Sequence, residues 1–296
     1  MQRVIGPGIY VAAIVGAIGI CWFSAEVGSL WAAYPLVFLF GVSITALMTY
    51  LWPVKRFLET PIEFREAFVV AAAALTANQL FFGPFSFQVS NAIARAIHSD
   101  AYIQFVHELP VWVAVPLVMV LSEGIGYLLH RWQHSNKIVW ERSHSVHHEP
   151  NSFGAALFLR FSYGDYFLQT GIRFAVLNLF QFSAFSITVA TTLGVLAGIV
   201  SHANTSLSFW GLNKILVTPD VHFWHHSPRV RVNYSVGLLN FFDRLGGTFF
   251  YPQSLPEELG IDGVLRARSG FEANLLRPPH WVNGQEIPAQ TQRVPR

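Results

Sequence analysis

Long apolar stretches dominate the pattern of this chain. A helix that crosses a bilayer takes about 17–25 predominantly apolar residues. Stretches of about this length cover residues 8–23, 30–52, 67–85 and 110–129, and Gly83-Pro84 breaks the third. We therefore predict spanning helices at these four places. The first has no clear small-residue cleavage site, so we interpret it as a retained helix and not as a signal peptide.

A fifth apolar stretch, residues 155–200, has a different pattern. Charged residues stand only near its start, at Arg160, Asp165 and Arg173, and residues 174–200 carry no charge. Its length fits either one long helix or a hairpin that turns near residues 181–183. We favour the hairpin, because an even number of crossings returns the chain to the side of the membrane where the stretch began.

Charge supports a membrane protein and sets its expected orientation. Only 12% of the residues are charged and 52% are hydrophobic, whereas soluble domains carry about 25% charged residues. The net charge of +2 is small and its basic residues are dispersed, which argues against nucleic-acid binding. Lys55, Arg56 and Arg65 lie between the second and third predicted spans, so we expect that loop to be cytoplasmic.

Histidines supply the candidate chemistry. Three of the twelve are isolated, at His98, His107 and His280, and we interpret these as surface or satisfied core residues. The other nine lie between residues 130 and 226, and eight of them form three clusters: His130 and His134; His144, His147 and His148; His222, His225 and His226. On a helix, residues three and four apart share a face. Each cluster is therefore predicted to present two or three imidazoles to one metal pocket.

The number of histidines points to two metal ions. A zinc site takes three or four protein ligands, and eight or nine imidazoles exceed one such site. Cys21 is the single cysteine, which excludes thiolate-rich sites. The clusters contain no bridging carboxylate and no His-Glu-x-x-His motif, so a two-zinc hydrolase is disfavoured. Iron that activates dioxygen is the better hypothesis, with Glu123 expected to accept a ring N–H of a ligating histidine.

The motifs resemble those of the fatty acid hydroxylase/sterol desaturase superfamily of membrane di-iron enzymes. The resemblance rests on Glu123 and Tyr127 ahead of His130-Arg-x-x-His134, on both His-x-x-His-His boxes, on His202-Ala-Asn204, and on Asn233-Tyr234 followed by Phe242-Asp243-Arg244-Leu245-Gly246-Gly247-Thr248. It covers residues 118–248. The chain departs from the usual pattern at Glu123, where Asp is common, at Ser235 (Gly), at Phe242 (Trp) and at Gly246 (Phe).

This resemblance implies a set of site residues. The nine iron ligands would be His130, His134, His144, His147, His148, His202, His222, His225 and His226. For His202 the alternative is a hydrogen bond behind the metals. Supporting catalytic roles beside the ligands would fall to Glu123, Tyr127, Asn204 and Asp243. Asn233 and Tyr234 would either buttress the last cluster or form a plain turn.

The predicted fold is an all-α, polytopic membrane helix bundle of about four to six spanning helices. A histidine-rich helical cap on the cytoplasmic side of an inner, plasma or ER-type membrane would hold the dinuclear metal site. Three parts are expected: N-terminal transmembrane helices (1–109), a histidine-box catalytic domain with a membrane hairpin (110–251), and a polar C-terminal segment and tail (252–296).

The expected activity is hydroxylation of an unactivated C–H bond of a lipid or sterol-like substrate taken from the bilayer. The chain has no His-Pro-Gly-Gly haem motif, no Gly-x-Gly-x-x-Gly and no cysteine cluster, so electrons must come from a separate ferredoxin- or cytochrome-type protein. A desaturase or an ether-lipid monooxygenase of the same superfamily is the alternative. A membrane metal transporter is a rival from another class, although transporters place their ligands at mid-membrane.

Overall fold

The computed structural model describes residues 2–59, 61–77, 80–81, 83–252 and 254–261. These residues form helices and connecting loops without a β-strand, apart from an isolated bridge between Leu216 and Leu239. The structure therefore confirms the predicted all-α fold. His280 and the predicted C-terminal tail lie outside the described residues.

Six helices among the described residues have at least fifteen residues: α1 (Gln2–Glu26), α2 (Ala33–Leu51), α3 (Pro61–Ala77), α4 (Gly83–Ile97), α6 (Val111–Ser135) and α12 (Ala184–Ser201). The shorter ones are η1 (Leu30–Ala32), η2 (Lys55–Phe57), α5 (Asp100–His107), α7 (Lys137–Val139), η4 (Trp140–His144), α8 (Ser145–His148), α9 (Ala155–Leu159), α10 (Tyr163–Asp165), η5 (Tyr166–Ile172), α11 (Arg173–Leu179), η6 (Leu212–Lys214), α13 (Pro219–His225) and α14 (Phe241–Leu245).

Four helical segments of the described chain are long and apolar enough to cross a membrane: Ile5–Glu26, Leu30–Leu51, Val111–Ser135 and Ala184–Ser201. The first three agree with the first, second and fourth predicted spans. In the third predicted span, α3 ends at Ala77 and α4 begins at Gly83, so the expected break at Gly83-Pro84 coincides with the start of a second helix. Pro84 lies in the first turn of α4, where its missing N–H costs no helical hydrogen bond.

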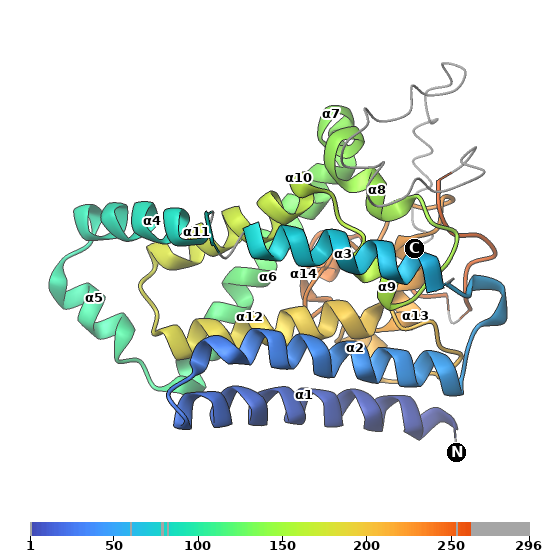
Figure 1. The fold of residues 1–296 in the computed structure, drawn as a ribbon, viewed down its shortest axis with the longest axis horizontal. Coiled ribbons are helices and arrows are strands. Elements are labelled where there is room, and N and C mark those ends of the chain that lie inside the picture. The colour runs from blue at the N-terminus through green and yellow to red at the C-terminus, as the bar shows by residue number, and fades with distance from the viewer. Residues whose placement is uncertain (1, 60, 78–79, 82, 253, 262–296) are drawn as a thin grey trace.

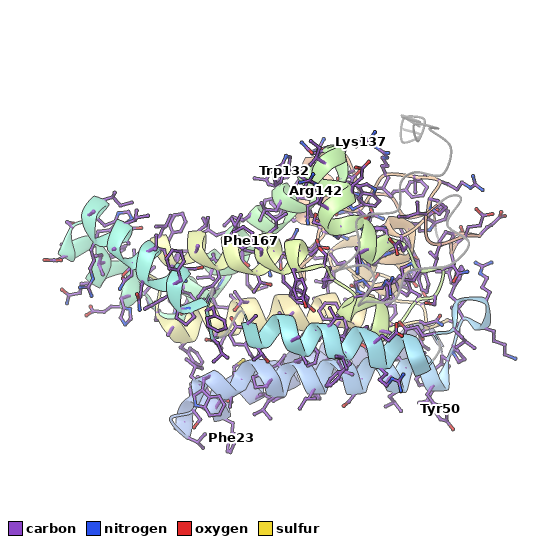
Figure 2. The ribbon with its side chains drawn as sticks, turned by 45° about the horizontal axis from the view of Figure 1, so that its top comes forward. Phe23, Tyr50, Trp132, Lys137, Arg142 and Phe167 are labelled. Carbon is purple, nitrogen blue, oxygen red and sulfur yellow. The ribbon has the colours of Figure 1, made fainter. Side chains whose placement is uncertain are left out.

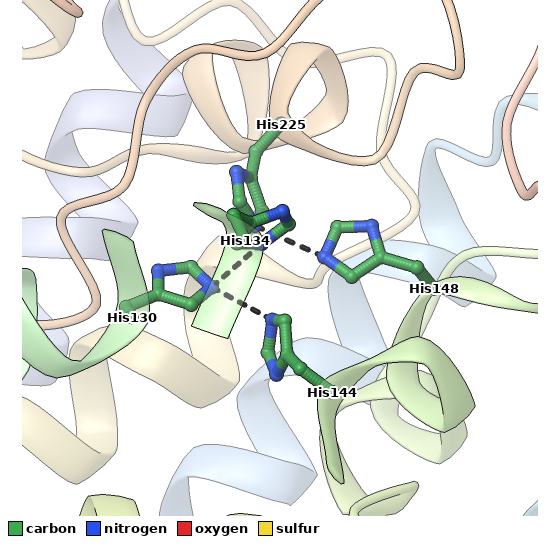
Figure 3. A group of neighbouring side chains, drawn as sticks. All are labelled: His130, His134, His144, His148 and His225. Carbon is green, nitrogen blue, oxygen red and sulfur yellow. Dashed lines mark hydrogen bonds between the residues drawn. The ribbon is translucent and has the colours of Figure 1, made fainter. Parts of the chain in front are cut away.

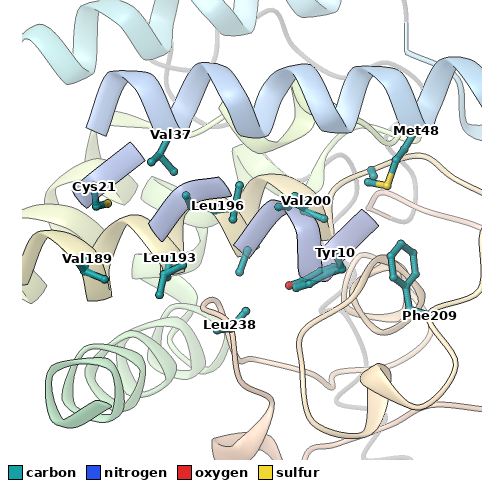
Figure 4. Close-up of a cluster of buried hydrophobic side chains, with 14 of the residues drawn as sticks. Tyr10, Cys21, Val37, Met48, Val189, Leu193, Leu196, Val200, Phe209 and Leu238 are labelled. Atoms are coloured by element: carbon teal, nitrogen blue, oxygen red, sulfur yellow. The ribbon is translucent and has the colours of Figure 1, made fainter. Parts of the chain in front are cut away.

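The spanning helices form a bundle around α12. Figure 1 shows α1, α2 and α12 side by side, with α3, α4 and α11 along the other side of the molecule. Helix α12 contacts α1, α2 and α6. Figure 4 shows their shared core, in which Val37, Leu193 and Leu196 are buried. The Tyr10 hydroxyl donates to the Val217 carbonyl (2.8 Å), which ties α1 to the loop before α13.

The predicted hairpin is confirmed. Its outgoing arm runs continuously through α10, η5 and α11, and its return arm is α12. The turn contains Gln181, which has a left-handed φ of 60°. Ser183 then caps α12 by accepting from the Ser186 N–H (3.2 Å). This turn brings the end of α12, and with it His202, back to the end of the bundle that holds His130.

Side chains are distributed as a lipid-facing bundle requires. Large apolar residues are exposed on the outside of the helices, among them Phe23 in α1, which projects from the bundle in Figure 2. Small polar residues such as Ser24, Thr45 and Ser90 are instead buried between helices. Helices in a membrane associate through such small residues, because lipid gives no hydrophobic drive to bury large ones.

Candidate metal centre

Nine histidines converge on two adjacent groups. Site A consists of His130, His134, His144, His148 and His225 (Figure 3), and site B of His147, His202, His222 and His226. Within each site the candidate ligand nitrogens all lie within 4.8 Å of one another. The rings of His148 and His226 stack with their centroids 4.3 Å apart, so the two sites are neighbours. His98 and His107 belong to neither site.

Helix geometry divides the clusters between the two sites. Residues four apart stay together, as do His144 with His148 and His222 with His226. Residues next to each other on a helix point about 100° apart. His147 therefore faces site B while His148 faces site A. The expectation that one cluster serves one pocket is thus wrong for the two His-x-x-His-His boxes, each of which supplies both sites.

Hydrogen bonds from Nδ1 fix four of the rings. His130 Nδ1 bonds the Tyr234 carbonyl (2.7 Å), His202 Nδ1 the Gly198 carbonyl (2.6 Å) and His225 Nδ1 the Val232 carbonyl (2.9 Å). His144 Nδ1 bonds Asp165 Oδ1 (2.9 Å). A carbonyl or carboxylate oxygen only accepts, so Nδ1 must carry the proton. In each neutral ring the lone pair is then on Nε2.

These Nε2 atoms face one another inside the sites. His130 Nε2 lies 2.7 Å from that of His144, and His202 Nε2 lies 3.0 Å from that of His222. Two lone pairs cannot bond to each other, but a cation between them binds both. Nitrogens that bind one metal at about 2.1 Å lie roughly 3 Å apart. The residues present therefore fit metal ions, which the predicted dinuclear site requires.

Burial keeps the imidazoles in the form that binds metal. It lowers the pKa of His202 to about 4 and that of His225 to about 3, against hydrogen bonds to Gly198 and Val232 that raise them. Burial also lowers the pKa values of His147, His148, His222 and His226, and neighbouring histidines lower them further. Neutral imidazole is the metal ligand, so these rings are in the right state at neutral pH.

Asp165 is the carboxylate that holds a site histidine, and the sequence reasoning did not assign it this role. Besides His144, it accepts from Gln133 Nε2 (2.6 Å), whose own oxygen accepts from Gln169 Nε2 (2.6 Å). Asp165 is completely buried. The signal was present, because a charged residue in an apolar membrane stretch is usually functional and faces the interior.

Glu123 and Tyr127 lie behind the site and do not contact a site histidine. The expectation that Glu123 accepts from a histidine is wrong: its two oxygens accept from the backbone N–H groups of Leu238 (2.8 Å) and Leu239 (2.9 Å). The Tyr127 hydroxyl accepts from Arg131 Nη1 (3.0 Å) and shares a hydrogen bond with Thr248 (3.2 Å). Glu123 thus attaches α6 to the loop that carries Tyr234, and Tyr127 attaches it to the segment after α14.

Asn204 and Asp243 organise backbone around the site. Asn204 Nδ2 donates to the carbonyls of Phe57 (3.0 Å) and Val54 (3.3 Å), which holds the loop after α2. Asp243 accepts from the N–H groups of Tyr234 (2.6 Å) and Ser235 (2.9 Å). Since the Tyr234 carbonyl orients His130, Asp243 acts on site A through one backbone segment.

Asn233 buttresses the last cluster, which was one of the two roles expected for it. It has a left-handed φ of 58°, a conformation that Asn tolerates better than most residues. Its Nδ2 donates to the carbonyls of Val221 (2.9 Å) and Phe250 (2.9 Å). The loop is thereby fastened to α13, which carries His222 and His225.

A cavity of about 150 Å³ adjoins both sites. Histidines of site A (His130, His144) and of site B (His147, His202, His222) form one part of its wall. Most of the remainder is apolar and comes from α2, α9, α12 and the outgoing arm of the hairpin: Phe38, Phe158, Leu159, Phe161, Tyr166, Gly194, Val195 and Gly198. An apolar chain in this cavity would lie directly against the two sites.

Comparison with known proteins places this centre in a family. Residues 115–248 match the sequence model of the family described as fatty acid hydroxylase, and this range contains every histidine of sites A and B. Over 97% of its length the chain is 26% identical to the ornithine lipid hydroxylase OlsE of Rhizobium tropici, of which the match covers 86%. No solved structure matches the chain.

The two matches confirm the predicted resemblance to the fatty acid hydroxylase superfamily. The family and the relative are both named as hydroxylases, which indicates an oxidoreductase enzyme. Its four apolar helices make it a membrane protein. Its histidine groups have the composition of a metal centre.

Proposed function

We propose that this protein is a membrane-bound di-iron monooxygenase that hydroxylates an unactivated C–H bond of a lipid. The observation that carries the proposal is the convergence of nine histidines on two adjacent sites, with four of the rings forced to turn their lone pairs inward. Imidazole binds iron and zinc alike, and the match to hydroxylases favours iron. The relative's name also supports a lipid as the substrate.

Two iron ions held by sites A and B would supply the activation of dioxygen. For hydroxylation the balance is one lipid C–H, one dioxygen, two electrons and two protons giving one alcohol and one water. The chain's own residues keep the imidazoles neutral and oriented. The cavity beside the sites holds the substrate and excludes bulk water from it.

The two electrons come from a separate redox protein of ferredoxin or cytochrome type, which we place on the cytoplasmic side. Lys55 and Arg56 of η2 support this side. They follow the end of α2, and the hydrogen bond from Asn204 to Val54 holds this end beside the end of α12. Lys137 and Arg142 stand beyond the end of α6 that carries His134 (Figure 2). The positive-inside rule favours the cytoplasm for such an end.

Metal analysis and oxygen uptake test this function. Protein purified from iron-replete cells should contain about two irons per chain. It should consume dioxygen only when reductant and lipid extract are both added, and ¹⁸O₂ should label the new hydroxyl group. A single zinc per chain, together with no oxygen uptake, would overturn the proposal.

A matched pair of variants ties the activity to the site. His147→Ala should lose metal from site B and abolish oxygen uptake, because His147 is one of the four site B histidines. His107→Ala should behave like the wild type, since His107 is exposed at the end of α5 and belongs to neither site. Equal losses in the two variants would refute the assignment of the ligands.

A further inference from the structure

An arginine faces the cavity beside the metal sites. Arg173 begins α11 and lines the cavity together with Gln169 and Thr170 of η5. Within the described part of the chain, its guanidinium has no hydrogen-bond or ion-pair partner. A guanidinium in apolar surroundings is costly unless it is paired. A partner supplied by a ligand would remove that cost.

The groups around Arg173 are already engaged with others. Glu123 acts on it electrostatically, but both Glu123 oxygens accept from backbone amides of the loop after Tyr234. The Tyr34 hydroxyl, the other electrostatic neighbour, is hydrogen-bonded to Thr191. Gly126 of α6 leaves room for the guanidinium, since a Cβ there would lie 3.0 Å from Arg173 Nη1. The fold thus accommodates this charge without neutralising it by a direct bond.

Arg173 lies on the same arm of the hairpin as a residue that holds a site histidine. Asp165, which holds His144, lies about two helical turns before Arg173 on the same arm of the hairpin. On the opposite wall, Gly194 and Gly198 of α12 precede His202 and add no side chain to fill the space between the arms. The cavity wall therefore contains the site histidines in one part and the Arg173 guanidinium in another.

The outgoing arm of the hairpin also carries hydrogen-bond acceptors without a partner. Asp165 Oδ2 and Gln169 Oε1 are buried and have no hydrogen-bond partner in the described chain, and both residues line the cavity. An alkyl chain would leave the cation and both acceptors unpaired. A headgroup with a carboxylate and an N–H would pair the cation and one of the two acceptors. One guanidinium with no lysine or second arginine among the described lining residues suits a monoanion better than a phosphate.

We propose that Arg173 binds a carboxylate of the substrate and so fixes which carbon lies against sites A and B. The substrate class is an amphiphile whose headgroup carries a carboxylate and an N–H donor, as in an N-acylated amino acid. This inference rests on the proposed function in taking the ligand to be a lipid substrate. It makes Arg173 a specificity-determining residue and gives it no role in the metal centre.

Two probes of the same size, one with a charged and one with a neutral headgroup, test this role. Tritiated N-palmitoylglycine carries the carboxylate, and tritiated N-palmitoylglycinamide replaces it by a neutral amide. The full-length, metal-loaded protein in detergent should bind the carboxylate probe at least tenfold more tightly in an equilibrium binding assay. Arg173→Gln should reduce this preference to below threefold while the affinity for the amide probe stays unchanged. Arg173→Lys should keep part of the preference.

Controls separate this role from folding and from the proposed function. Arg95→Gln changes an exposed arginine in α4 and should keep the full preference. If Arg173→Gln fails to fold, the binding of the two probes by the wild type and by Arg173→Lys still tests the proposal. Equal binding of both probes by the wild type, or a preference that survives in Arg173→Gln, would overturn the proposal. Iron content and oxygen uptake are measured on the same samples, so failure of the proposed function is seen separately from failure of the carboxylate site.

Discussion

At the scale of single residues, the centre depends on where each imidazole proton is held. In site A, an acceptor fixes the proton on Nδ1 of His130, His144 and His225. Two of these acceptors are backbone carbonyls, which any residue at that position would supply. The third is a side chain, Asp165, and it is therefore the point where a substitution acts directly on ligand orientation.

Asp165→Asn should weaken metal binding at site A. Asparagine keeps an oxygen beside His144 but loses the carboxylate charge that strengthens the ligand, and changes of this kind cost roughly 10- to 100-fold in metal affinity. A chelator titration followed by metal analysis of the full-length protein measures the effect. Asp100→Asn, at the start of α5, is the matched control and should release metal like the wild type. Unchanged retention in Asp165→Asn would show that Asp165 does not support the ligand.

At the scale of elements, the sequence predicted what depends on local pattern. Long apolar stretches gave three of the four candidate spans, and the turn near residues 181–183 gave the fourth as the return arm of a hairpin. The histidine spacing identified eight of the nine residues that converge, and the family resemblance added His202. The domain boundaries at 109 and 251 stay a prediction, and the family match over residues 115–248 does not decide them.

What the sequence did not predict depends on contacts between distant elements. Asp165 meets His144 only because the outgoing arm of the hairpin lies against η4. Glu123 has the right spacing on α6 to reach a histidine, but the loop at Leu238 and Leu239 approaches it and offers two N–H donors. Spacing along one helix shows which face a residue is on, but it does not show which distant segment arrives there.

Contact between α6 and the end of α14 restricts the residue at position 246, where the chain departs from the family pattern. Gly246 replaces a common phenylalanine. A Cβ at this position would lie 2.0 Å from the Tyr127 hydroxyl and 3.0 Å from Tyr127 Cζ. Tyr127 in turn stacks on Phe242, with ring centroids 6.0 Å apart. The tyrosine hydroxyl occupies the space that a larger residue would need, so the two positions are coupled.

Gly246→Ala should therefore destabilise the protein, and Tyr127→Phe should partly rescue it. The added methyl group overpacks the contact, which typically costs about 1–3 kcal/mol, and removal of the hydroxyl relieves it. Apparent melting temperatures of the two single variants and the double variant give the coupling between the sites. Gly19→Ala is the control, because a Cβ at Gly19 has no neighbour within 4 Å. Purely additive effects would contradict the coupling.

At the scale of the whole molecule, charge differs between the two ends of the bundle. The end that carries sites A and B has Lys55, Arg56, Lys137 and Arg142 close to the spanning helices. At the other end of α6, the charged groups of the last turn of α4, of α5 and of the residue after it are Arg95, Asp100 and Glu108. By the positive-inside rule, the excess of basic residues at the first end predicts that this end is cytoplasmic, and the orientation decides whether a cytoplasmic reductase can reach the centre.

Cysteine labelling at the two ends of α6 tests this orientation. Glu108→Cys and Lys137→Cys flank the span, and both positions are exposed. Native Cys21 is buried, which keeps background reaction low. A membrane-impermeant maleimide should label only Glu108→Cys in intact cells and only Lys137→Cys in inverted membrane vesicles. Labelling of Lys137→Cys in intact cells would put the centre on the outer side and would exclude electron delivery from a cytoplasmic donor.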